Sequence, residues 1–224
     1  IPLDEKNLVY KAYLAMKDKY KFRENFLIHI EKNIPVSAGI AGGSTNSAVV
    51  IEMIDEILGL NMSLEDRKKI GRSRGADIPY LLVGKTARTR GIGDELEILD
   101  RLPETNILIV NNGVEISTPY IYSNIVPTGS SDRVEKLVSI YKNKNYDEFI
   151  DNLYNVMEEV SISYCPEIQE IKDKMYEFNC VKSLMSGSGP TVFGIYKNDK
   201  DIENAYNYFK KLYKNTFKVK TMER

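Results

Sequence analysis

A glycine-rich loop between a predicted strand and a strong amphipathic helix constrains the fold of this chain more than any other feature. Residues 26–31 alternate between two faces, with Phe26, Ile28 and Ile30 on one of them, as in a half-buried strand. Residues 44–58 carry an apolar stripe opposite an acidic one, which predicts a helix. The loop that joins them consists of Pro35, Val36, Ser37, Ala38, Gly39, Ile40, Ala41, Gly42, Gly43, Ser44 and Thr45.

The start of a helix presents backbone N–H groups that have no partner within the helix, together with the positive end of the helix dipole. Gly39, Gly42 and Gly43 let phosphate oxygens approach the backbone, because no Cβ stands in the way. The hydroxyls of Ser44 and Thr45 could bind a phosphate group, and Ser44 could also bind its magnesium ion. The loop therefore predicts a phosphate site, and a glycine-rich turn capped by Ser44 is the alternative.

Two common nucleotide-binding loops are disfavoured by the residues of this one. A Walker A loop needs a lysine directly after its glycines, and none follows Gly43. A dinucleotide-binding fingerprint needs a glycine where Ala41 stands. The chain is therefore expected to bind phosphate on a different fold.

Two further segments carry candidate functional residues. Asp77 lies between a turn of small residues and a predicted strand at 80–83, where a carboxylate can accept the proton of a reacting hydroxyl. The alternative for Asp77 is a helix cap or a turn former. A second flexible turn precedes a predicted strand at 191–196, and a simple hairpin turn is its alternative; its residues are Ser186, Gly187, Ser188 and Gly189.

The rest of the chain mixes helices and strands without a regular alternation, which favours an α+β fold over a doubly wound sheet. The patterns predict helices that begin at Asp4 and Ser63, and others at 131–142, 147–160, 166–178 and 200–213. Further strands are predicted at 86–90, 106–111 and 217–221. The segment around Pro127 predicts a boundary between a domain at 1–127 and a domain at 128–224.

Composition excludes several classes of protein. A net charge of -1 and a pI near 6.1 argue against nucleic-acid or anionic-membrane partners, and no apolar run reaches the length of a membrane span. Cys165 and Cys180 are expected to be free thiols in a reducing cytoplasm. His29, the single histidine, makes no metal site alone. We expect a cytoplasmic protein, monomeric or homodimeric, with a small-molecule substrate.

Taken together, these segments resemble the GHMP family of small-molecule kinases. The family's second and third motifs look like residues 35–48 and 183–193, and the segments 4–9, 75–79 and 91–94 are also similar. The resemblance runs over essentially the whole chain. It implies a two-lobed fold, with an N-terminal lobe like domain 2 of ribosomal protein S5, incomplete at its start, and a ferredoxin-like C-terminal lobe.

The resemblance also implies a reaction and roles for its residues. The γ-phosphoryl group of ATP would move, with Mg²⁺ assisting, onto the tertiary 2-hydroxyl of a cytidyl-linked methylerythritol, a step toward isoprenoid precursors. Asp77 would be the base, and the loop from Pro35 to Thr45 would wrap the ATP phosphates. Asn7 would lie near the adenine. Ser186 to Gly189 would support the site, and Thr118 would approach the substrate.

The family's first motif, with a catalytic lysine and a Tyr-His pair that grips the cytosine, would lie upstream of Ile1 and is not in this sequence. The 224 residues by themselves are therefore expected to be inactive. Two alternatives stay open: another kinase of the same family, acting on homoserine, mevalonate or a sugar, and an inactive fragment that still binds nucleotide.

Overall fold

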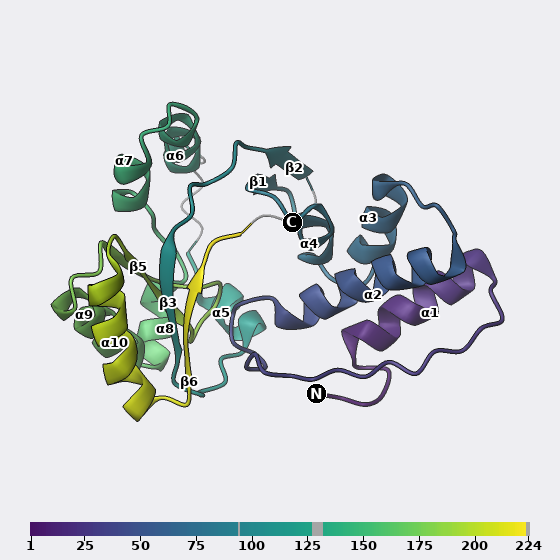
Figure 1. Ribbon diagram of the computed structural model, residues 1–224, viewed down its shortest axis with the longest axis horizontal. Helices are drawn as coiled ribbons and strands as arrows, with labels where there is room; N and C mark the ends of the chain where they lie inside the picture. The colour runs from purple at the N-terminus through teal and green to yellow at the C-terminus, as the bar shows by residue number, and fades with distance from the viewer. Residues whose placement is uncertain (94, 127–131, 223–224) are drawn as a thin grey trace. The chain divides into compact units, whose positions relative to one another are not determined.

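The computed structural model describes residues 1–93, 95–126 and 132–222 and confirms the mixed α+β class (Figure 1). The chain forms two compact units. The first contains Ile1–Val36 and Ala41–Arg101, and the second contains Ser37–Ile40 and residues 102–222. The segment Ser37–Ile40 of the glycine-rich loop thus packs with the second unit, whereas its neighbours on both sides pack with the first.

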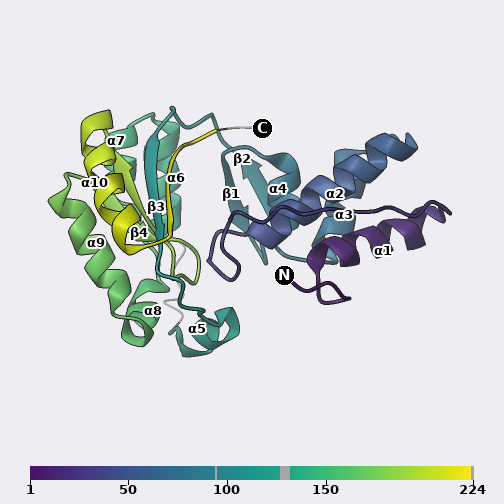
Figure 2. The same cartoon turned by 60° about the horizontal axis from the view of Figure 1, so that its bottom comes forward.

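The first unit is largely helical. Its helices α1 (Leu8–Tyr20), α2 (Gly42–Leu58) and α3 (Leu64–Arg72) lie side by side, and α4 (Ile78–Val83) packs on the last two (Figure 2). An antiparallel hairpin follows, made of β1 (Ala87–Arg90) and β2 (Glu95–Ile98). The apolar core of this unit consists of Val9, Ala12, Met16, Ala48, Val50, Ile51, Ile54, Met62, Ile70, Ile78 and Leu82.

Local signals fix the ends of α2 and α3 as the sequence predicts. Gly59 ends α2 with a left-handed backbone, φ +60°, and its N–H bonds the Asp55 and Glu56 carbonyls. The Ser63 hydroxyl accepts a hydrogen bond from the Asp66 N–H at 3.1 Å and begins α3. The predicted start of α2 was two residues late, because Gly42 and Gly43 form its first turn.

Three predictions in the first unit are wrong. Residues 26–31 are not a strand, because alternation decides only which side chains share a face, and a strand also needs a partner. They line a hollow of about 350 Å³ against α2 instead. Asp4 does not cap α1, since Asn7 occupies that position. Residues 80–83 belong to α4, because Pro79 sits in a first helical turn and Gly84 ends the helix.

The second unit is built on a four-stranded antiparallel sheet in the order β4-β5-β3-β6. Its strands are β3 (Asn106–Asn111), β4 (Lys182–Met185), β5 (Val192–Tyr196) and β6 (Asn215–Lys220). Figure 1 shows α9 (Glu167–Glu177) and α10 (Asp199–Leu212) along this sheet, which they cover. Four further helices belong to this unit: α5 (Thr118–Asn124), α6 (Asp132–Lys142), α7 (Tyr146–Asp151) and α8 (Glu158–Tyr164).

The predicted helix at 147–160 is two helices, α7 and α8, with an irregular segment between them. Asparagine side chains offer the backbone hydrogen bonds that compete with a helix. The Asn152 amide donates to the Glu148 carbonyl at 2.8 Å and ends α7. The Asn155 side-chain oxygen accepts from the Met157 N–H at 2.9 Å. The strands β2 and β4 and the helix α5 were not predicted, because each is short and has little periodicity.

The predicted boundary at 127/128 falls outside the described residues. The compact units divide at Arg101/Leu102, because β3 pairs with β5 and β6 near the end of the chain. Both cysteines are free and buried, as expected. Burial raises the pKa of the Cys180 thiol to about 12, so this thiol is protonated at neutral pH.

Candidate active site

The first turn of α2 has the features of an anion site. Ala41 precedes the helix with a left-handed backbone, φ +50°, and no side chain caps the helix there. The first helical hydrogen bond runs from the Thr45 N–H to the Ala41 carbonyl at 2.9 Å. The N–H groups of Gly42, Gly43 and Ser44 come before this bond and therefore have no acceptor within the helix. A cap by Ser44, the alternative raised by the sequence, is wrong because Ser44 lies inside the helix.

Lys32 lies beside this helix start, although no motif in the sequence marks it. A Cβ added at Gly42 would lie 2.7 Å from Lys32 Nζ, so the glycine makes room for the ammonium group. Burial lowers the pKa of Lys32, because desolvation disfavours its charged form. An anion at the helix start would favour that charge. The signal available in the sequence was a lysine three residues before Pro35.

The segment that carries Asp77 comes close to the same helix start within the first unit. A Cβ at Gly75 would lie 3.8 Å from Ser44 Oγ, which brings the segment of Asp77 to the first turn of α2. Asp77 occupies the N-cap position of α4, yet its side chain makes no capping hydrogen bond and is exposed. Asp77 therefore does not cap α4 with its side chain, and its carboxylate is accessible to solvent.

Asn7 caps α1 with both atoms of its amide engaged. Its Oδ1 accepts from the Val9 N–H at 3.0 Å, and its Nδ2 donates to the Pro2 carbonyl at 2.8 Å. Leu8, the next residue, lies against Gly43, since a Cβ there would be 3.4 Å from Leu8 Cδ1. The residue after Asn7 thus lies at the start of α2, and the Asn7 side chain has a structural role as the cap of α1.

In the second unit, Gly39 lies directly against the turn formed by Ser186, Gly187, Ser188 and Gly189, here called the SGSG loop. Ser186 Oγ donates to the Gly39 carbonyl at 2.9 Å. Gly39 has φ +72°, and a Cβ there would lie 2.3 Å from the Ser186 carbonyl oxygen. A Cβ at Gly187 would lie 2.9 Å from the Gly39 carbonyl oxygen. Two of the sequence motifs, 147 residues apart, therefore meet backbone to backbone.

Thr118, at the start of α5, joins the other side of the SGSG loop. Its Oγ1 and Ser188 Oγ are 2.8 Å apart, a hydrogen bond in which either hydroxyl donates. Tyr122, one helical turn later, is 62% exposed. Tyr120 packs on Tyr164, with ring centroids 5.5 Å apart. No such ring contact accounts for the exposed side chain of Tyr122 in the part of the chain that the structure describes.

Other candidate groups lie outside these sites. Among the described residues, no three His, Cys, Asp or Glu side chains gather as they would around a metal ion. His29 and Lys85 are exposed. Within residues 1–93, 95–126 and 132–222, no helix has the length and apolar character needed to span a membrane.

Comparison with known proteins matches both units to one family. Residues 7–85 match the GHMP kinases N terminal domain, and residues 135–215 match the GHMP kinases C terminal. A 4-diphosphocytidyl-2-C-methyl-D-erythritol kinase of Finegoldia magna is 39% identical over 221 residues, which are 99% of this chain and 79% of that protein. The kinase of the same name from Caldicellulosiruptor bescii is 40% identical over 225 residues, 100% of this chain and 79% of its own.

Solved structures show the same fold. A crystal structure of 4-(cytidine 5'-diphospho)-2C-methyl-D-erythritol kinase aligns with a TM-score of 0.81 at 24% identity, covering 98% of this chain and 80% of that one. A homoserine kinase from Cytophaga hutchinsonii aligns with a TM-score of 0.76 at 19% identity, covering 100% and 78%. At these identities the likeness concerns the fold alone.

Proposed function

Since the chain belongs to the GHMP kinase family, we propose that it transfers the γ-phosphoryl group of ATP to the 2-hydroxyl of 4-diphosphocytidyl-2-C-methyl-D-erythritol. The chain is an ATP-dependent kinase, and this reaction belongs to the non-mevalonate route to isoprenoid precursors. The observation that carries the proposal is the 39% identity, over 99% of the chain, to a relative named for this substrate. The homoserine kinase shares the fold at 19% identity, which does not favour its substrate.

The first unit supplies the groups for ATP and for the proton. The N–H groups of Gly42, Gly43 and Ser44 and the ammonium of Lys32 would bind phosphate oxygens. Asp77 would accept the proton of the attacking hydroxyl. Magnesium, which screens the charge of a triphosphate, usually takes few protein ligands in kinases. Ser44 is the ligand we propose for it.

The second unit supplies the groups for the other substrate. Thr118 and Ser188 are hydrogen-bonded to each other and present two hydroxyls at one place. Tyr122 is exposed one turn of α5 beyond Thr118, where its ring can stack on a pyrimidine base. We propose that Thr118 faces the substrate and that Tyr122 binds the cytosine. This arrangement would explain a preference for a cytidyl-linked alcohol over a small unlinked one.

A substrate panel tests the proposed reaction. The full-length protein is incubated with ATP, Mg²⁺ and one of three alcohols: 4-diphosphocytidyl-2-C-methyl-D-erythritol, homoserine or mevalonate. We expect phosphorylation of the cytidyl substrate with a kcat/KM at least about 100-fold above the other two, because only that substrate has a base to bind. Turnover of homoserine or mevalonate in its place would assign another activity of the family.

The Lys32→Met variant of the full-length protein is expected to bind ATP about tenfold more weakly, because a charge-assisted hydrogen bond to a phosphate oxygen is lost. Isothermal titration with a non-hydrolysable ATP analogue measures this change. Lys85→Met, which removes an exposed lysine from a turn, is the matched control and should leave the affinity unchanged. Equal affinities for all three proteins would remove Lys32 from the phosphate site.

A further inference from the structure

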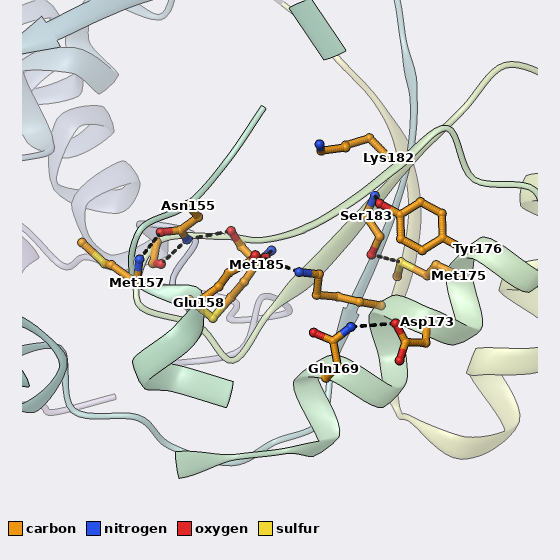
Figure 3. A network of polar contacts seen from close by, with 12 residues as sticks. Asn155, Met157, Glu158, Gln169, Asp173, Met175, Tyr176, Lys182, Ser183 and Met185 are labelled. Carbon is orange, nitrogen blue, oxygen red and sulfur yellow. Dashed lines mark hydrogen bonds and ion pairs between the residues drawn. The ribbon is translucent and has the colours of Figure 1, made fainter. Parts of the chain in front are cut away.

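The SGSG loop and the end of β4 are held by Asn155, just before α8, and by side chains of α8; Figure 3 shows Asn155 and Glu158 beside Met185. Asn155 Nδ2 donates to the carbonyl oxygens of Met185 at 2.9 Å and Gly187 at 2.7 Å. Glu158 accepts from the Met185 N–H at 2.7 Å. Buried Ser161 donates from its hydroxyl to the Ser188 carbonyl at 3.1 Å. Side chains of residues 155–161 therefore hold peptide groups of Met185, Gly187 and Ser188.

Glu158 is held in turn by Lys172 of α9. The Lys172 ammonium lies 2.7 Å from one carboxylate oxygen of Glu158, and the other oxygen accepts the Met185 N–H. The two side chains are only 12% and 16% exposed. An ion pair withdrawn from water stabilises a fold no better than apolar residues of the same shape. Its value here lies in the fixed position that it gives to the carboxylate.

The opposite side of the SGSG loop contacts Gly39 and Thr118. Ser186 donates to the carbonyl of Gly39 in the glycine-rich loop, and Ser188 is hydrogen-bonded to Thr118, which we propose faces the substrate. In a planar trans peptide the N–H and C=O point to opposite sides. Because Asn155 holds the Gly187 carbonyl, the N–H of Ser188 points away from Asn155. A shift of the loop would therefore displace Gly39 and Thr118 together.

We propose that Asn155, Glu158 and Lys172 are positioning residues of this kinase, which hold the SGSG loop against Gly39 and Thr118 without contacting ATP or substrate. The inference rests on the proposed function for its kinetic consequences only, because the contacts themselves are a property of the second unit. The clamp, as we call these three residues, fixes the loop before any ligand binds. Pre-organisation of this kind lowers the cost of reaching the reactive geometry.

The test compares Lys172→Met with Lys174→Met in the full-length protein. Lys174 lies two residues further along α9, is more exposed and pairs with Glu177, so its loss is a matched control. We expect Lys172→Met to lower kcat/KM about tenfold or more, chiefly through kcat, at a temperature where the variant is folded. Lys172→Arg, which keeps a cation near Glu158, should recover most of this loss, and Lys174→Met should match the wild type.

A double variant shows whether activity is lost because Glu158 moves or because the fold is less stable. In Lys172→Met the carboxylate of Glu158 is left without its cation, and we expect it to move away from Met185. In Glu158→Gln combined with Lys172→Met, the neutral amide oxygen can still accept the Met185 N–H, so activity should rise again toward wild type. A double variant no better than Lys172→Met alone would contradict the clamp.

Amide hydrogen exchange in the ligand-free protein decides the same question without catalysis. Exchange in residues 183–193 and in Ser37–Ile40 should be faster in Lys172→Met and unchanged in Lys174→Met. Asn155→Asp is a second variant that should disturb the loop. It keeps the acceptor for the Met157 N–H, but it replaces the donor to the Met185 and Gly187 carbonyls with an oxygen that repels them. Unchanged exchange and unchanged kcat/KM in both Lys172→Met and Asn155→Asp would overturn the proposal. If the wild type does not phosphorylate the cytidyl substrate, the proposed reaction is wrong, and the exchange results still test the clamp.

Discussion

The Asp77→Asn variant of the full-length enzyme is expected to lose about three orders of magnitude in kcat while its affinity for ATP stays within about twofold of the wild type. The amide keeps the size and shape of the side chain but cannot accept the hydroxyl proton at neutral pH. Asp77 makes no capping bond to α4, so its replacement costs the helix little. The loss therefore reports on chemistry and not on folding.

Steady-state kinetics with the cytidyl substrate and titration of an ATP analogue measure the two quantities separately. Asp18→Asn is a suitable control, because it removes an exposed carboxylate that pairs with Lys21 at the surface. This control should keep both its turnover and its affinity. Retention of more than about a tenth of the turnover by Asp77→Asn would show that another group accepts the proton.

The Gly39→Ala variant is expected to lose about 3 kcal/mol of unfolding free energy, together with most of its turnover. A left-handed backbone accounts for about 1–2 kcal/mol of this loss. The rest comes from the Cβ, which would lie 2.3 Å from the Ser186 carbonyl oxygen. That oxygen belongs to the backbone and cannot rotate away, so the SGSG loop must move. Its movement would displace Thr118 and the glycine-rich loop.

Urea denaturation of Gly39→Ala and of the control Gly113→Ala separates the free-energy cost of the close Cβ contact from that of the left-handed backbone. Gly113 also has a left-handed backbone, φ +82°, but nothing lies within 4 Å of a Cβ placed there. Its replacement should cost about 1–2 kcal/mol and leave turnover unchanged. If both variants lose the same free energy, the close approach of Gly39 to the SGSG loop does not hold in solution.

Much of the local structure could be read from the sequence because its signals are local. Gly59 and Ser63 mark helix ends through backbone freedom and a hydroxyl cap, and the structure confirms both. The apolar runs at β3 and β5 are confirmed as buried strands. The family could also be recognised, because its glycine motifs serve close backbone contacts that tolerate no side chain. Gly39 and Gly187 show such a contact directly.

Only the tertiary structure decided which of these segments meet. The pattern of residues 26–31 allows a strand, but pairing depends on a partner elsewhere in the chain. Lys32 reaches Gly42, and Lys172 reaches Glu158, through folding that no short window of sequence contains. The sequence by itself determined the end of α2 at Gly59, the start of α3 at Ser63 and the family. Packing determined the environment of each functional group, because electrostatics and hydrogen bonding act between neighbours in space and not along the chain.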